Sequence, residues 1–146
     1  MKRAVVVDVS VRLIFPALIV GSLYLLTAGH NQPGGGFVGG IVAGAAITLR
    51  YVAGGVDEVR RLSRAKPWTV LGAGLLLAGL TALAPLVGGG AVLESVKAEV
   101  DMPGLGLVKV SSSLVFDVGV YLVVLGLVLM VFESFGDDPE PEESGR

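Results

Sequence analysis

One carboxylate lies inside a long apolar run toward the C-terminal end of the chain. It is Asp117, within Ser-Leu-Val-Phe-Asp-Val-Gly-Val-Tyr at residues 113–121. On a helix, Ser113, Asp117 and Tyr121 share one face, because side chains four residues apart lie above one another. Carboxylates inside a membrane usually face protein or water and often line ion paths. Two interpretations follow: a relay for H+ or Na+, or an interfacial carboxylate satisfied by Tyr121, a serine or a partner subunit.

The single histidine, His30, precedes a run of three glycines. An imidazole titrates near neutral pH and can shuttle protons. Because no second titratable group stands nearby in sequence, a loop histidine that caps a helix end or docks a neighbour is the favoured interpretation. The run Gly34–Gly36 lacks the lysine and hydroxyl residue of a phosphate-binding loop, so it indicates a tight or re-entrant turn instead.

The remaining chemical inventory is sparse. The chain has no cysteine, which excludes disulfides, thiolate metal sites and a cysteine nucleophile. The sequence shows no carboxylate pair, Ser/His/Asp set, metal cluster or nucleotide motif. We therefore predict neither an enzyme nor a nucleic-acid partner, and we expect no metal site and no organic cofactor. A complete antiporter normally needs more titratable groups within the membrane, so a subunit is favoured.

The elements that must position these residues are membrane helices. The chain is 53% hydrophobic and 16% charged, with a mean hydropathy of +0.78. Four apolar runs each approach the length of about 20 residues that crosses a bilayer, and they cover approximately residues 11–28, 37–52, 68–87 and 112–132. We predict an all-α integral membrane domain over residues 1–136. The acidic, proline-broken segment 137–146 is predicted to be a disordered tail.

A row of small residues marks the second run. Gly36, Gly40 and Gly44 recur every four residues, and Thr48 extends the row. Such a face allows two helix backbones to approach closely in lipid. The spacing predicts a tight helix contact, made either with the third helix or with another subunit.

The basic residues predict the orientation. With four crossings, all eleven Lys and Arg except Lys97 and Lys109 fall on one side of the membrane. The positive-inside rule then places both termini and the 57–67 loop in the cytoplasm. Residues 88–110 form an outer excursion, for which short strands and a surface helix are both compatible with the pattern.

Two motifs resemble the MnhB/MrpB subunit of Mrp-type multisubunit Na+/H+ antiporters. The first is Gly-His-Asn-Gln-Pro-Gly-Gly-Gly-Phe-Val-Gly-Gly at residues 29–40, preceded by Phe-Pro at 15–16, and the second is Leu-Val-Phe-Asp-Val-Gly-Val-Tyr-Leu at 114–122. The resemblance covers nearly the whole chain except the tail. Ser113 departs from it, since proline is expected there. The matching positions are His30, Pro33, Gly34, Gly35, Gly36, Phe37, Phe116, Asp117 and Tyr121.

The resemblance implies a multi-pass subunit in the plasma membrane of a prokaryote, within an obligate hetero-oligomer. Large subunits similar to those of respiratory complex I would carry the proton channels, and small subunits would help to form the Na+ path. One alternative is the homologous subunit of a complex I-related membrane-bound hydrogenase. Two others are an assembly protein without ion contact and a small transporter that works as a homo-oligomer.

Overall fold

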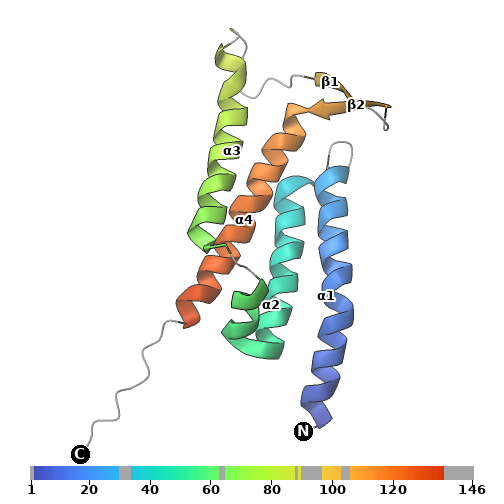
Figure 1. The fold of residues 1–146 in the computed structure, drawn as a ribbon, viewed down its shortest axis with the longest axis vertical. Coiled ribbons are helices and arrows are strands. Elements are labelled where there is room, and N and C mark those ends of the chain that lie inside the picture. Colours follow the sequence, from blue (N-terminus) through green and yellow to red (C-terminus); the bar gives the residue numbers. More distant parts are fainter. Residues whose placement is uncertain are drawn as a thin grey trace, which may run out of the picture.

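A computed structural model describes residues 2–29, 34–62, 65–87, 89, 97–102 and 106–136 (Figure 1). The elements in chain order are α1 (Lys2–Ala28), α2 (Gly35–Leu62), α3 (Pro67–Val87), β1 (Lys97–Met102), β2 (Gly106–Ser111) and α4 (Ser112–Gly136). His30, Pro33 and the acidic segment 137–146 lie outside the described residues.

Four helices are long and apolar enough to cross a membrane, which confirms the predicted helical membrane fold. These stretches are Val6–Ala28, Gly35–Leu62, Pro67–Val87 and Ser112–Phe135. Many large apolar side chains remain on the surface, such as Val20 and Leu80, at 67% and 66% exposure. An apolar surface of this extent is what a helix bundle presents to lipid or to partner helices.

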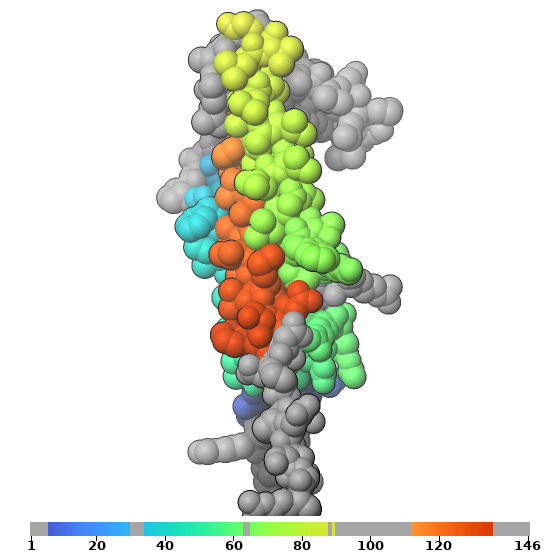
Figure 2. Space-filling model, turned by 90° about the vertical axis from the view of Figure 1, so that its left-hand side faces the viewer, coloured from blue at the N-terminus to red at the C-terminus, as the bar shows by residue number. Residues whose placement is uncertain are grey.

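The four helices lie in a row, in the order α3, α4, α2, α1 (Figure 1). Figure 2 shows α3 and α4 packed side by side along their length. Glycines on α4 make this contact close, because a Cβ at Gly119 would lie 2.6 Å from the nitrogen of Ala78 and one at Gly126 would lie 2.6 Å from that of Leu71. The backbones of α3 and α4 therefore touch, as expected for small residues between membrane helices.

The glycine row of α2 packs on α4, which decides a question that the spacing left open. A Cβ at Gly40 would lie 2.8 Å from the Cβ of Val124, and one at Gly44 would lie 2.9 Å from Cγ2 of Val128. The glycine face of α2 therefore packs on α4 of the same chain, and not on α3 or on another subunit. Helix α4 consequently presents glycines to α3 and larger side chains to α2.

Thr48 does not continue this row of contacts. Its side chain is exposed, and its hydroxyl donates a hydrogen bond of 2.9 Å to the carbonyl of Gly44 in the same helix. At 3.6 residues per turn, a four-residue step drifts by about 40°, so the third step after Gly36 has turned about 120° away. The predicted row therefore ends at Gly44.

Helix α2 changes direction near its C-terminal end. Gly55 has φ 72° and ψ −167°, a conformation that glycine adopts readily and other residues rarely do. In Figure 1 the last turns of α2 run back beside its main part. There Val59 is buried with Ile47, Leu129 and Phe132. The prediction ended this helix near Val52 and so missed the returning segment.

The described part of the outer excursion is a hairpin. Strands β1 and β2 pair antiparallel, from Lys97 opposite Ser111 to Met102 opposite Gly106. Strand β2 leads into α4 without a break. The hairpin lies at the opposite end of the helix row from the first turns of α1 (Figure 1). The predicted topology likewise puts the N-terminus and the outer excursion on opposite sides of the membrane.

Helix α1 begins earlier than the predicted start near Val11. Its first turns extend from Lys2 and include an ion pair between Asp8 and Arg12, in which Oδ2 and Nη2 are 3.1 Å apart. The two side chains are 51% and 70% exposed, and they are four residues apart on one helix face. Charged residues thus extend the helix beyond the apolar run that the prediction relied on.

Candidate functional site

The first turn of α2 lies directly against Asp117 of α4. A Cβ placed on Gly35 would lie 3.3 Å from both carboxylate oxygens of Asp117. Gly35 has a φ of 87°, so it starts the helix in a conformation that side chains disfavour. The first turn of a helix carries unpaired N–H groups and the positive end of the helix dipole. The carboxylate therefore lies beside the N-terminal end of α2.

The next residues of α2 bring three backbones together. A Cβ on Gly36 would overlap the carbonyl oxygen of Asp117, so a larger residue at this position would force α2 and α4 apart. A Cβ on Gly39 would lie 2.7 Å from the carbonyl oxygen of Ser22 in α1. The glycines that the sequence singled out thus make the site possible by letting α1 and α4 close around α2.

One turn further along the helices, a hydrogen bond between Ser22 and Tyr121 links α1 to α4. Ser22 is fully buried, and its Oγ donates to the carbonyl of Ile19 at 2.8 Å. The Tyr121 hydroxyl lies 3.1 Å from the same Oγ. Because a serine hydroxyl carries one proton, which is already donated to Ile19, Tyr121 must be the donor in the second bond. The chain of donors ends at a backbone carbonyl, so it holds the helices together rather than passing a proton onward.

Ser22 was missed by the sequence reasoning. The available signal was a lone serine inside an apolar run, since serine in membrane helices often bonds across to a neighbouring helix. Asp117 and Tyr121, which were predicted to share a face, both lie against the first turns of α2. Ser113, their predicted neighbour, is exposed at the start of α4.

The two aromatic positions of the motifs differ in their surroundings. Phe37 is 59% exposed in the first turn of α2, and Phe116 is half-buried beside Asp117 in sequence. Phe37 therefore offers an apolar side chain to whatever surrounds the row of helices. Within the described residues, no group of three His, Asp or Glu side chains could hold a metal ion. The chemical content of the site is one half-buried carboxylate, a helix N-terminus and a tyrosine–serine pair.

These features define a small multi-pass membrane protein with a single carboxylate at a three-helix contact. Residues 6–130 match the family described as "Domain related to MnhB subunit of Na+/H+ antiporter". The chain belongs to this family, as its motifs indicated.

Curated relatives match along almost their whole length. The chain is similar to the B-type subunit of the Na(+)/H(+) antiporter of Bacillus subtilis (strain 168), with 35% identity over 91% of this chain and 93% of the relative. It is also similar to the B-type subunit of the Na(+)/H(+) antiporter of Alkalihalophilus pseudofirmus, with 34% identity over 83% of this chain and 84% of the relative.

A solved structure carries the same fold. The chain is similar to part of the Mrp complex from Dietzia sp. DQ12-45-1b, with a TM-score of 0.79 and 33% identity over 97% of this chain. This chain spans only 15% of the length of the chain that it matches there. The fold thus occurs within a much longer polypeptide of an Mrp assembly.

Proposed function

We propose that this chain is the B-type subunit of a multisubunit Na+/H+ antiporter of the plasma membrane. The observation that carries the proposal is the end-to-end match to the B-type antiporter subunit of Bacillus subtilis, which covers 93% of that protein. The likeness to the Mrp complex supports an assembly with other subunits. The hydrogenase alternative is not favoured, because these relatives are named as antiporter or Mrp proteins.

The chain would act as one component of the transporter and pack beside large complex I-like subunits, as the family resemblance implies. Its orientation, with both termini in the cytoplasm, rests on the distribution of Lys and Arg. The hairpin would then lie outside the cell, and the α2–α3 connection would lie inside.

Asp117 is the residue proposed to meet the transported ion. A carboxylate can accept H+ or bind Na+ through its oxygens, and this one is only half-buried at the edge of the α2–α4 contact. Its oxygens lie beside the first turn of α2, at Gly35. Tyr121 and Ser22 would fix the helices around it without binding the ion. His30 stays an ion-path candidate from the sequence, beside the favoured interpretation of a loop histidine that caps a helix end or docks a neighbour.

The test of the proposal is affinity purification of the tagged chain in mild detergent, followed by mass spectrometry of what accompanies it. We expect large antiporter-like subunits. Iron–sulfur or nickel subunits would instead assign the chain to a hydrogenase. Recovery of the chain alone, from membranes in which other complexes survive, would contradict the assignment as a subunit.

A further inference from the structure

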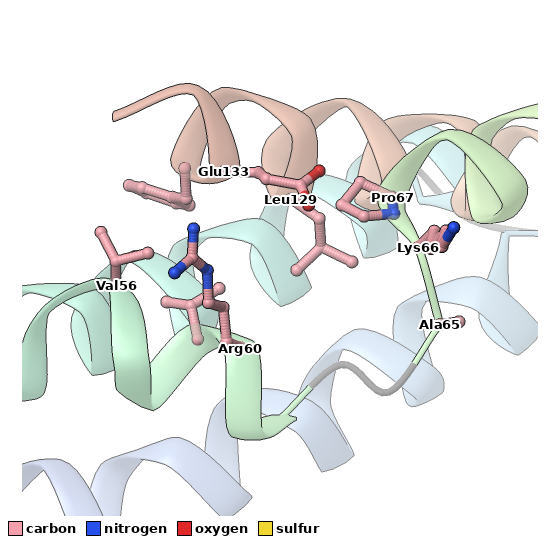
Figure 3. A pocket seen from close by; sticks show the side chains of 9 residues that line it. Val56, Arg60, Ala65, Lys66, Pro67, Leu129 and Glu133 are labelled. Carbon is pink, nitrogen blue, oxygen red and sulfur yellow. The ribbon is translucent and has the colours of Figure 1, made fainter. Parts of the chain in front are cut away.

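A cavity of about 140 Å³ lies among the residues labelled in Figure 3. It is open on one side and is lined by the returning segment of α2, the start of α3 and the last turns of α4. Its floor is apolar and includes Val59, Leu129 and Phe132. This volume is well above the space that one water molecule needs, so the cavity can receive part of a larger ligand.

The rim of this cavity is charged. Arg60 and Lys66 line it, together with Glu133. Figure 3 shows Arg60 extending from the end of α2 toward α4, with Lys66 near the start of α3. Two cations against one carboxylate leave a net positive charge, so the cavity favours an anionic group. Its apolar floor, however, does not suit a small, strongly hydrated anion.

The cavity lies at the boundary of the membrane. The apolar stretch of α3 begins at Pro67, and that of α4 ends at Phe135. Trp68 is 61% exposed, and the Lys66 Nζ lies 5.1 Å from the centre of its ring. Exposed tryptophan at a helix end is typical of the headgroup region. The opening is therefore at the depth where lipid phosphates lie.

We propose that this cavity binds the phosphate headgroup of an anionic phospholipid. The phosphate would lie at the rim beside Arg60 and Lys66, and the first part of an acyl chain would lie on the apolar floor. Charge and depth together favour this ligand, because only an amphiphile satisfies both the cationic rim and the apolar floor. The bound lipid would fasten the returning segment of α2 to α3 and α4, in the leaflet at this end of the bundle.

Photochemical labelling in vesicles tests the proposal with the purified protein and the subunits that accompany it. One set of phosphatidylcholine vesicles contains phosphatidylglycerol with a diazirine acyl chain, and a matched set contains phosphatidylcholine with the same chain. After irradiation, labelled peptides are quantified by mass spectrometry. With one net positive charge near the membrane surface, we expect peptides covering residues 56–67 and 129–133 to be labelled about fivefold more by phosphatidylglycerol.

Variants assign this preference to the cavity. Lys66→Gln and Arg60→Gln should each bring the labelling ratio close to one, whereas Glu133→Gln should raise it about fivefold. The matched control is Arg61→Gln, since Arg61 is exposed on the same helix turn and does not line the cavity. It should leave the ratio unchanged.

Four results would overturn the proposal. Equal labelling by the two lipids would remove the preference for an anionic headgroup, and strong labelling confined to other peptides would place the lipid elsewhere. An Arg61→Gln effect as large as that of Arg60→Gln would indicate diffuse surface charge. Competition by millimolar inorganic phosphate would indicate a small-anion site instead of a lipid site.

Discussion

The two ends of α2 pack by different means. At the N-terminal end, Gly36 and Gly40 bring the backbone against α4, and the polar group in the contact is the carboxylate of Asp117. At the C-terminal end, large side chains make the contacts. Tyr51 stacks on Phe132 with ring centres 4.5 Å apart.

The two ends of α2 differ in how much the packed groups can move. Backbone contact tolerates no added atoms, so the N-terminal end holds Asp117 in a fixed position. Side-chain contact leaves space, and the cavity beside Arg60 is at that end. The same helix therefore has one end that can fix a charged group and one end that can receive a ligand.

The largest effect is expected when a single methyl group is added to the backbone contact at the N-terminal end of α2. Gly36→Ala should destabilise the folded chain by about 3 kcal/mol, because the new Cβ would overlap the carbonyl oxygen of Asp117. The matched control is Gly21→Ala in α1, where a Cβ would meet nothing within 4 Å. Thermal unfolding of the purified complex in detergent measures both. Equal midpoints for the two variants would show that the close contact is not rigid.

Asp117→Asn tests whether the fixed carboxylate has a role in transport. The substitution keeps the size and removes the charge, so we expect Na+/H+ antiport in vesicles to fall by about tenfold or more with normal complex assembly. Asp117→Glu, which keeps the charge, should retain more activity than Asp117→Asn. Unchanged antiport in Asp117→Asn, together with unchanged assembly, would remove the ion-path role.

Tyr121→Phe distinguishes two possible roles of the Tyr121 hydroxyl, which are to hold α1 against α4 and to conduct a proton. Loss of the hydroxyl removes the bond to buried Ser22 and should cost about 1 kcal/mol of stability. Antiport per assembled complex should stay the same, since the donor chain ends at a backbone carbonyl. Tyr24→Phe is the control, because Tyr24 is 66% exposed. A large fall in antiport without a fall in stability would instead place Tyr121 on the proton path.

The smallest expected effect concerns the ion pair across the bend in α2. Arg50 Nη1 lies 2.6 Å from Glu58 Oε1, and the two side chains are 21% and 31% exposed. Glu58→Gln should cost about 0.7 kcal/mol, compared with about 0.3 kcal/mol for Asp8→Asn in the more exposed pair of α1. The shift in thermal unfolding midpoint of each variant from the unchanged protein measures these costs. Equal shifts would mean that the pair adds nothing to the bend.

The sequence predicted the helices more successfully than their ends. A bilayer imposes a minimum apolar length, so the four spans could be recognised from composition alone. The prediction failed where charged residues continue a helix, as at Lys2 and in the segment after Gly55. That segment is held by Val59 and by the Arg50–Glu58 pair, and neither contact is visible as a local pattern.

Part of the candidate site was also accessible from spacing. The four-residue interval predicted that Asp117 and Tyr121 share a face, and the structure places both against α2. Ser22 could not be found in this way, because its partner is 99 residues away in sequence. Spacing also overextended the glycine row to Thr48, since the helical period is 3.6 rather than 4 residues.

The order α3, α4, α2, α1 has a geometrical consequence for an assembly. Except where α1 reaches α4 through the Ser22–Tyr121 bond and where α2 runs back beside itself, this row is a wall one helix thick, about 10 Å with its side chains. Such a wall has two broad faces, so two large neighbours can touch the same small chain from opposite directions. If one neighbour moved against one face, the helices of this chain would transmit the displacement to the neighbour on the other face.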